Sequence, residues 1–255
     1  MTTTSLEMHL RSLRLPSFVA HHDELAHTAE DQGWSFTKYL HALAELEIEE
    51  RRVRRIQRLR LASSLPADKT LATLELDRFP VKVRRQIPVL CDGDFVERAD
   101  NVLAFGLPGR GKTHLVCAVG HELVERGYKV LFCPAYQLVQ RLLEAKRDLL
   151  LDKELARLDR FHAIIIDDIG YIQQSREEME VLFTLLSERY ERRSVMITSN
   201  LVFSKWDQIF KDAMTTAAAI DRLVHHCIIL ELAGESYRNE QAKKRNGARR
   251  ERRKK

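Results

Sequence analysis

Hydrophobic residues recur at helical spacing through the first part of the chain. Leu6, Leu10 and Leu13 follow one another by one helical turn each, which is the periodicity of an amphipathic helix. Pro16 is suited to the first turn of a second helix, and Gly33 is suited to its end. The N-terminus is therefore predicted to begin with two short helices.

A third helix is predicted over about residues 36–61, where apolar positions interrupt dense charge. Its segment EIEERRVRRIQRLR, residues 47–60, holds Glu and Arg one turn apart, and such pairs stabilise a helix surface. The arginines outnumber the glutamates, so the segment fits either a solvated helix face or a helix that contacts DNA. Ser63-Ser64-Leu65-Pro66 ends the unit. We predict an all-helical N-terminal domain over residues 1–66 that binds DNA or a partner.

From residue 67 onward, short apolar runs alternate with segments of helical periodicity. The apolar runs are VLAFG at 102–106, KVLFC at 129–133, AIIIDD at 163–168, SVMITSN at 194–200 and CIILEL at 227–232. Strands that alternate with helices form a parallel sheet covered on both faces. We predict a three-layer α/β/α domain over residues 67–240 with a five-stranded parallel sheet.

Charge is unevenly distributed along the 255 residues. Residues 243–255 hold nine Lys or Arg and one Glu, so this segment has a charge of +8. Because the whole chain has a net charge of +5, the remaining residues sum to about −3. We expect residues 241–255 to form a basic, disordered tail. Such a tail suits an anionic polymer such as DNA, although a solvated end that only aids solubility has the same composition.

The four cysteines form no recognisable metal or disulfide motif. Cys91, Cys117, Cys133 and Cys227 include no CxxC pair, and the last three lie in apolar runs, where cysteine acts as a small hydrophobe. This pattern argues against a disulfide framework or a zinc module and fits a reducing cytoplasm. No stretch approaches the ~18 apolar residues of a membrane span, and the N-terminus lacks the apolar core of a signal peptide. We expect a soluble cytoplasmic protein without a membrane partner.

The segment GLPGRGKTH, residues 106–114, has the spacing of a phosphate-binding loop, G-x-x-x-x-G-K-[ST]. It follows a predicted strand and precedes a predicted helix, which is the context that the motif requires. Its glycines let backbone N–H groups turn toward phosphate oxygens, and the helix N-terminus adds a positive dipole end. Lys112 can neutralise the β- and γ-phosphates, and Thr113 can hold Mg²⁺. The candidate nucleotide-binding residues of this loop are Gly106, Leu107, Pro108, Gly109, Arg110, Gly111, Lys112, Thr113 and His114.

Two later strands end in polar residues that face the same crevice. AIIIDD ends in Asp167, placed to be the second Mg²⁺ partner, and Asp168, which can polarise an attacking water or can merely cap the turn. SVMITSN ends in Asn200. Because the carboxyl ends of parallel strands face the ligand crevice, Asn200 can hydrogen-bond the γ-phosphate or the attacking water. A turn role for Asn200 is the alternative, since Asn is common in turns.

The stretch AAAIDRLVHHC, residues 217–227, places two histidines beside a cysteine. Adjacent residues on a strand point to opposite faces, so His225 and His226 are not expected to bind one metal ion together. No carboxylate is placed beside Cys227 to form a catalytic triad. We expect the histidines to pack or hydrogen-bond at the start of the last strand and Cys227 to lie in the core.

Taken in this order, GLPGRGKTH, IIIDDIGY, LLSERYERRSVMITSNL, AAAIDRLVHH and GESYR resemble the motifs of the IstB-type ATP-binding proteins of bacterial insertion sequences. These are similar to the DnaC-type helicase loaders, and both belong to the AAA+ ATPases. The resemblance extends to about residue 240. It implies a helper ATPase that uses ATP and Mg²⁺, assembles on duplex DNA as a ring or filament, and acts with a separate transposase in target selection.

The resemblance also implies roles at the phosphate site. Lys112 and Thr113 correspond to the phosphate loop, Asp167 to the metal-side acid and Asn200 to the sensor asparagine. A glutamate is usual where this chain has Asp168. The shorter side chain leaves hydrolysis possible and points to slow turnover.

Residues farther from the loop receive roles by the same resemblance. Arg222 corresponds to the arginine finger, which a neighbouring subunit supplies, and Arg238, in GESYR, to the second sensor near the γ-phosphate of its own subunit. Leu74, Leu76 and Phe79 fall where the family packs the adenine base.

Three other functions share some of these motifs. A helicase loader would have the same ATPase domain and would differ in having a replicative helicase as partner. A small-molecule phosphotransferase would need an acceptor pocket and a lid, and no motif for either is found. A switch that binds ATP without hydrolysing it, and so only promotes filament formation, stays open because of Asp168.

Overall fold

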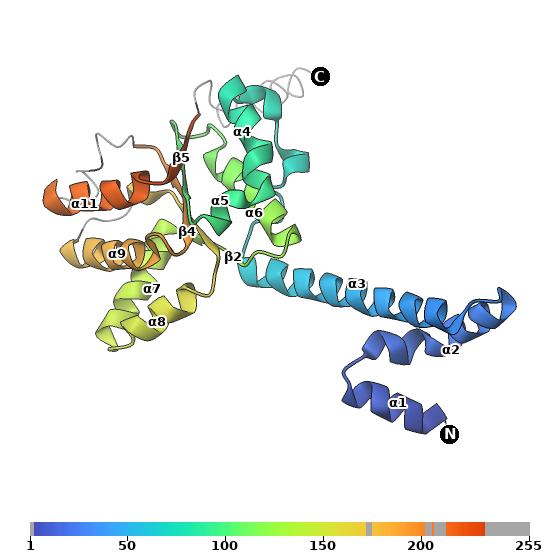
Figure 1. Cartoon of the computed structure of the whole chain (residues 1–255). Helices are drawn as coiled ribbons and strands as arrows, with labels where there is room; N and C mark the ends of the chain where they lie inside the picture. Colours follow the sequence, from blue (N-terminus) through green and yellow to red (C-terminus); the bar gives the residue numbers. More distant parts are fainter. Residues whose placement is uncertain (1–2, 172–174, 202–205, 207–212, 233–255) are drawn as a thin grey trace, which may run out of the picture. The chain divides into compact units, whose positions relative to one another are not determined.

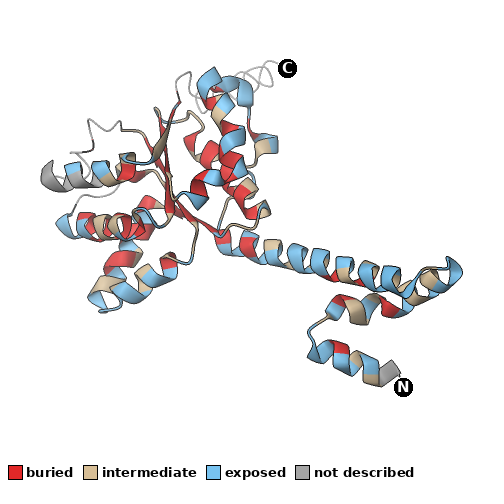
Figure 2. Cartoon of the chain, viewed as in Figure 1, coloured by how far each residue is buried: buried red, intermediate tan, exposed pale blue. Residues whose placement is uncertain are grey.

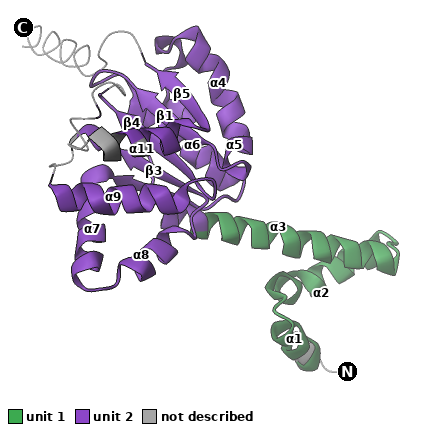
Figure 3. Ribbon diagram, turned by 60° about the vertical axis from the view of Figure 1, so that its left-hand side comes forward, with its two compact units in different colours: residues 1–58 green, residues 59–255 purple. Residues whose placement is uncertain are grey.

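The computed structural model describes residues 3–171, 175–201, 206 and 213–232 of the chain (Figure 1). The chain divides into two compact units, residues 1–58 and 59–255 (Figure 3). Each unit is considered by itself below. Within the described residues, no helix has both the length and the apolar character needed to cross a membrane.

The first unit consists of helices, as predicted. They are α1 (Thr3–Ser12), α2 (Pro16–Asp31) and the first part of α3 (Phe36–Ser63). Pro16 occupies the start of α2, where its missing N–H costs nothing. Gly33 follows the end of α2 with a left-handed φ of 61°, which glycine adopts without steric cost.

Acidic residues of α3 hold α2 in place. Glu47 is buried and accepts hydrogen bonds from the Ser17 backbone N–H at 2.8 Å and from Arg51 Nε at 2.6 Å. Burial alone would raise the pKa of Glu47, but these hydrogen bonds outweigh it and hold the pKa below its ordinary value. Glu50 accepts a further bond from the Ser17 hydroxyl at 2.9 Å. Glu47 and Glu50 therefore have a structural role.

The second unit is built on a five-stranded parallel sheet. Its strands are β1 (Asn101–Phe105), β2 (Val130–Pro134), β3 (Ala163–Asp167), β4 (Ser194–Ser199) and β5 (Cys227–Glu231). They lie in the order β2-β3-β4-β1-β5, and all neighbours are parallel. All five predicted strands are confirmed. The central strand β4 lies between β3 and β1 and pairs with both. Because the strands are parallel, the carboxyl ends of β1 and β3 both lie beside the carboxyl end of β4.

Helices cover both faces of the sheet (Figure 1). One face packs against α4 (Val81–Asp92), α5 (Asp94–Glu97) and α6 (Lys112–Glu125). The other packs against α7 (Ala135–Arg147), α8 (Leu151–Leu158), α9 (Arg176–Arg189) and α11 (Ala213–Val224). Short 3₁₀ turns are η1 (Leu71–Thr73), η2 (Leu76–Arg78) and η3 (Ile169–Tyr171). This is the predicted α/β/α sandwich.

Alternation along the strands divides the core into two layers. In β3, Ile164 and Ile166 join the cluster beneath α7 and α9, whereas Ala163 and Ile165 join the cluster beneath α4 and α6. Side chains of a strand point alternately to its two faces, so a strand buried on both faces must be apolar throughout (Figure 2). The unbroken run AIII satisfies that requirement.

The boundary between the units lies inside α3. Leu59 is buried in the core cluster that contains α4 and α6, and Arg60 Nε pairs with Glu125 Oε1 of α6 at 2.6 Å. The last turns of α3 therefore belong to the α/β unit. The helical domain was predicted to end at residue 66, whereas the compact units divide between residues 58 and 59.

Candidate nucleotide site at the carboxyl edge of the sheet

The segment between β1 and α6 forms a loop that curves tightly against its surroundings. Gly111 has a left-handed φ of 82° and caps the start of α6. A Cβ at this position would come within 3.2 Å of the Phe79 ring. At Gly106, a Cβ would come within 2.5 Å of the Leu232 carbonyl oxygen, which is closer than real contacts allow. The two glycines of the motif are thus required both by conformation and by space.

Lys112 holds its charge inside the curve of the loop. Its side chain is buried, and Nζ donates hydrogen bonds to the carbonyl oxygens of Gly106 at 2.7 Å and Leu107 at 3.2 Å. Carbonyl oxygens are weaker partners for an ammonium group than phosphate oxygens, because hydrogen bonds between two charged groups are stronger. The lysine is therefore placed to exchange these partners for a phosphate.

Three side chains from three elements meet at one carboxylate oxygen. Asp167, at the end of β3, accepts hydrogen bonds on Oδ1 from Thr113 Oγ1 at 2.8 Å and from Thr198 Oγ1 at 2.7 Å. Thr113 begins α6, and Thr198 lies near the end of β4. The structure thus joins Thr113 to Asp167, the predicted metal pair. A hydroxyl beside a carboxylate is an oxygen donor set that suits Mg²⁺.

Thr198 is the residue of this cluster that the sequence analysis did not single out for a role. Its hydroxyl also accepts a hydrogen bond from the Asp168 backbone N–H at 2.8 Å. Asp168 has a left-handed φ of 59°, a conformation that aspartate tolerates better than most residues. The Thr198 hydroxyl therefore fixes the turn in which both aspartates lie. The strand-end position of Thr198 was visible in the sequence, but its partner was not.

Asn200 presents an unsatisfied polar atom to this edge of the sheet. Within the described residues, its Oδ1 is buried and has no hydrogen-bond partner. Gly170 of η3 makes room for it, since a Cβ there would lie 2.2 Å from Asn200 Oδ1. A buried, unpaired amide oxygen costs free energy, and a ligand or its water would satisfy it. In the loop, the Arg110 atoms Nε and Nη1 are likewise buried without a partner among the described residues.

Some predicted nucleotide contacts face elsewhere. His114 Nε2 lies 3.2 Å from the Thr70 carbonyl oxygen and 3.1 Å from Thr73 Oγ1, so its ring is directed to η1. Phe79 and Leu74 are buried in the core beneath α4 and α6, and Phe79 supports the loop at Gly111. Leu76, by contrast, is 45% exposed. The three residues thus differ in exposure, and their assignment to the adenine base stays a prediction.

Arg222 lies at the opposite edge of the sheet from the phosphate loop. It is near the end of α11, just before β5, and Cys227 at the start of β5 pairs with Asn101 at the start of β1. The loop follows the other end of β1. A five-residue strand spans about 17 Å, so Arg222 is separated from the phosphate site of its own chain. Its guanidinium carbon lies 5.0 Å from the centre of the Phe183 ring on α9. Arg238 lies outside the described residues.

The histidine pair packs just before the last strand, as expected, but its two rings lie side by side. His225 and His226 occupy the turn between α11 and β5, and their ring centroids are 4.3 Å apart. The expectation that they would point to opposite faces was wrong because they precede the strand. Cys227 packs against the core, and burial raises the pKa of its thiol to about 12. A thiol with so high a pKa is a poor nucleophile at neutral pH.

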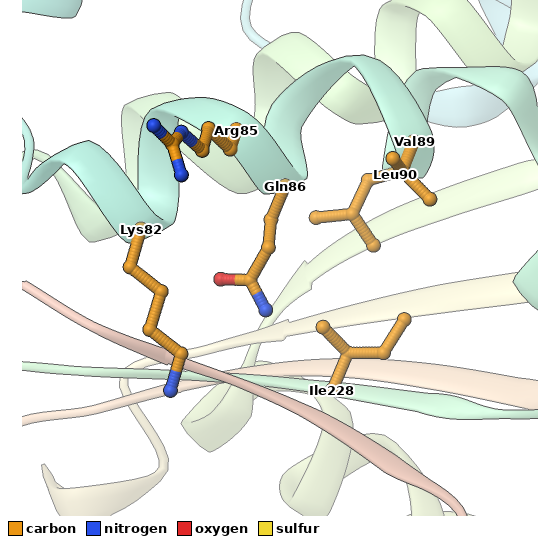
Figure 4. Close-up of a pocket in the computed structure, with 6 residues that line it drawn as sticks. All are labelled: Lys82, Arg85, Gln86, Val89, Leu90 and Ile228. Atoms are coloured by element: carbon orange, nitrogen blue, oxygen red, sulfur yellow. The ribbon is translucent and has the colours of Figure 1, made fainter.

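A separate groove lies between α4 and the edge strand β5 (Figure 4). Ile228 forms its floor and pairs with Val102, near the start of β1. The groove is therefore displaced from the carboxyl edge at which the phosphate loop lies, and it is not part of that site. The residues that line it are Lys82, Arg85, Gln86, Val89, Leu90 and Ile228.

Comparison with known sequences gives consistent matches over most of the chain. The family described as IstB-like ATP binding protein matches residues 8–245. A Sinorhizobium fredii protein named for an insertion sequence and for ATP binding is 43% identical over 234 residues, which cover 91% of this chain and 78% of that protein. A Geobacillus stearothermophilus protein named for insertion sequence IS5376 and for ATP binding is 37% identical over 226 residues, which cover 89% and 90%.

Two solved structures share the fold. The crystal structure of the DnaC helicase loader matches with a TM-score of 0.57 at 17% identity, over 66% of this chain and 98% of that one. The replication initiator DnaA, bound to AMPPCP and single-stranded DNA, matches with a TM-score of 0.57 at 18% identity, over 68% of this chain and 52% of that one. At these identities, the likeness concerns the fold alone.

The fold and the phosphate loop, together with these matches, define an ATP-binding protein with the AAA+ fold. Within that class, the chain belongs to the IstB-like ATP-binding protein family, since the family matches residues 8–245 and a relative is 43% identical over most of both chains. The resemblance read from the sequence motifs is confirmed.

Proposed function

We propose that this protein is a DNA-binding ATPase that assembles on duplex DNA and acts with the transposase of the same element in selecting the insertion target. The observation that carries the ATPase part of the proposal is the cluster formed by Thr113, Asp167 and Thr198 beside Lys112. The relatives' names support the association with insertion sequences.

Each side chain at the carboxyl edge has a distinct part in the proposed hydrolysis. Lys112 binds the β- and γ-phosphates, and Thr113 and Asp167 hold the magnesium ion, which neutralises charge on the phosphate oxygens. Asp168 orients and polarises the attacking water from a turn that Thr198 holds in place. The unpaired Oδ1 of Asn200 is available to the same water.

Arg222 is proposed to complete the site of a neighbouring subunit. Its place at the opposite edge of the sheet argues against a role at its own phosphate loop. The local alternative is pairing with Asp221 or Asp212, and an ion pair at the surface is worth at most ~1 kcal/mol; Asp212 lies outside the described residues. An arginine that reaches a neighbour's γ-phosphate makes hydrolysis depend on assembly, so we propose a ring or filament that forms with ATP. Arg238 is proposed to contact the γ-phosphate of its own subunit.

Two basic segments are proposed to bind the DNA backbone. On α3, Arg52, Arg55 and Arg58 are exposed, with Arg52 paired to Glu49 at 3.4 Å, while Glu47 and Glu50 are engaged with α2. That division favours a DNA role for the arginines over a purely solvated face. The cationic segment 243–255 is the second candidate, since phosphate contacts by Lys and Arg supply most non-specific DNA affinity.

A helicase loader is the second candidate function. It is favoured by the match to nearly the full length of the DnaC helicase loader structure. The two functions share ATP binding and assembly, and they differ in the partner. A replicative helicase retained on the immobilised protein in the presence of ATP, with the transposase absent, would favour the loader.

Electron microscopy of the protein with duplex DNA, with and without ATP, tests the main proposal. We expect rings or filaments on DNA only when ATP is present, and none with Lys112→Ala protein. Particles that stay monomeric under all conditions would contradict the assembly. Equal assembly without nucleotide would contradict its dependence on ATP.

A further inference from the structure

Two turns at the amino edge of the sheet bring three metal-binding side chains together. Glu191 lies in the turn between α9 and β4, and His225 and His226 lie in the turn between α11 and β5. One ligand atom from each lies within 4.8 Å of the other two, and all three side chains are exposed. They form the one such group among the residues that the structure describes. The sequence separation of more than thirty residues concealed it.

The ligand chemistry fits zinc better than magnesium. Two imidazole nitrogens and one carboxylate oxygen are a ligand set that Zn²⁺ accepts, leaving a fourth position for water, whereas Mg²⁺ prefers oxygen ligands alone. Ligand atoms around tetrahedral zinc are about 3.4 Å apart, given bonds of 2.0–2.2 Å. His225 Nδ1 and Glu191 Oε1 are 3.8 Å apart. Exposed side chains can close this difference by small rotations.

The surroundings fix the turn that carries Glu191, and a neighbouring hydroxyl engages one of the histidines. The Tyr190 hydroxyl lies 3.0 Å from His225 Nδ1, so this hydrogen bond is released when Nδ1 binds zinc. The α9–β4 turn is anchored by Arg189, whose buried guanidinium donates to the carbonyl oxygens of Leu158 at 3.1 Å and Ser194 at 2.9 Å. The turn that presents Glu191 is therefore fixed from within the core.

We propose that Glu191, His225 and His226 form a surface zinc site that links the end of α9 to the end of α11. Cys227 is not a ligand of this site, because its side chain packs against the core cluster and is not part of the group of ligand atoms. His225 and His226 follow Arg222 by three and four residues, which is one helical turn. If the proposed role of Arg222 is correct, zinc would stiffen the end of the helix that carries it. The zinc site itself does not depend on that role.

Calorimetric titration with Zn²⁺ tests the site, using tag-free full-length protein without nucleotide. We expect one zinc ion per chain for the wild type. His225→Ala, His226→Ala and Glu191→Gln should each weaken binding by more than tenfold. Tyr190→Phe should bind zinc at least as tightly as the wild type, because it removes a hydroxyl that competes with zinc for His225 Nδ1. His41→Ala is the matched control, because His41 is exposed and pairs with a single carboxylate, Glu45.

The outcomes distinguish a specific zinc site from non-specific zinc binding. They also test the zinc site independently of the proposed ATPase activity. Saturable binding that the three ligand variants lose and His41→Ala retains supports the site, whatever the ATPase activity. Absence of binding by the wild type overturns it, as does equal binding by the wild type and the ligand variants. ATP affinity and the circular dichroism spectrum, measured in parallel, check that each variant is folded. Excess Mg²⁺ should leave zinc binding unchanged, and full displacement of zinc by Mg²⁺ would contradict the assigned ligand set.

Discussion

At the scale of single residues, Asp167 is the point on which the candidate site converges. Its Oδ1 receives both the Thr113 and the Thr198 hydroxyl. A carboxylate held by two donors is already oriented before any ligand arrives, and such preorganisation lowers the cost of binding a metal–nucleotide complex. Loss of either hydroxyl should therefore affect more than one hydrogen bond.

Thr198→Val should destabilise the fold modestly and impair turnover strongly. Valine has a similar shape but cannot donate to Asp167 or accept from the Asp168 N–H. Hydrogen bonds to charged groups contribute about 1.5–3 kcal/mol, so the melting temperature should fall by several degrees. ATPase activity should fall at least tenfold. Thr184→Val is the control, because the Thr184 hydroxyl bonds the Glu180 carbonyl within its own helix.

Lys112→Ala should abolish measurable nucleotide binding. The buried ammonium group is the positive charge that the structure places inside the phosphate loop, and the loop's backbone alone cannot neutralise two phosphates. Calorimetry with ATP and Mg²⁺ measures the effect. Lys146→Ala, which removes a half-buried lysine paired with Glu180, should bind ATP normally. Wild-type affinity in Lys112→Ala protein would refute the assignment of the loop.

Asp168→Asn should separate binding from turnover. The amide can still accept a hydrogen bond but cannot act as a base, and a positioned general base contributes typically 10²–10⁴-fold. ATP affinity should be unchanged while the single-turnover hydrolysis rate drops by that order. Unchanged hydrolysis would show that Asp168 does not activate the water. A wild-type protein that binds ATP and never hydrolyses it would instead identify a nucleotide-dependent switch.

At the scale of elements, the strands of the sheet were predicted correctly because their burial requires a short run of consecutive apolar residues. Each strand is a short apolar run bounded by turn residues, because both faces of a parallel sheet are covered. The glycine pattern placed the loop between β1 and α6 for a similar local reason. The predicted elements of the α/β unit could therefore be located from neighbouring residues alone.

Contacts between side chains from distant segments could not be predicted from local sequence patterns. The contact of Thr198 with Asp167 spans thirty-one residues, and the approach of Glu191 to His225 spans thirty-four. The histidines were misjudged because the alternation of side chains along a strand was applied to two residues that precede β5 and lie in a turn. Stacking of Arg222 on Phe183 likewise depends on how α11 packs on α9, which no local pattern specifies.

The position of α11 leads to a test of shared sites. Arg222→Ala should still bind ATP, since the phosphate loop is intact, but should hydrolyse it about 10³–10⁵-fold more slowly if the arginine is a finger. Lys112→Ala protein has a defective loop and an intact Arg222. Mixed on DNA, the two variants should recover part of the activity, because one subunit can donate its arginine to the other's loop.

Controls for the mixing test concern assembly. Fluorescence transfer between labelled variants must demonstrate that mixed assemblies form. If they form and the activity equals the sum of the separate variants, Arg222 does not act between subunits. A recovered activity that requires DNA would also tie hydrolysis to assembly on the duplex.

At the scale of the whole molecule, charge is distributed between a nearly neutral body and a strongly basic C-terminal segment. Residues 243–255 carry nine cations, and the exposed arginines of α3 provide a second basic segment. A protein with two such segments can hold DNA through either or through both. Affinity at a single salt concentration cannot distinguish these arrangements, whereas the salt dependence counts the phosphate contacts.

Removal of residues 243–255 should weaken duplex binding and flatten its salt dependence. Each phosphate contact contributes about −0.9 to the slope of log K against log salt, so loss of nine cations changes the slope by at most about 8. A full-length variant with these lysines and arginines replaced by glutamine is the matched control for chain length, and it should behave like the truncation.

Arg52→Ala combined with Arg58→Ala should change the slope by about 2 or less, since two contacts are removed. Titrations at several salt concentrations, with ATP affinity measured to confirm folding, give all three slopes. A slope that the truncation leaves unchanged would show that the segment does not contact DNA, and a slope altered only by the α3 variant would assign the DNA contact to the helical unit.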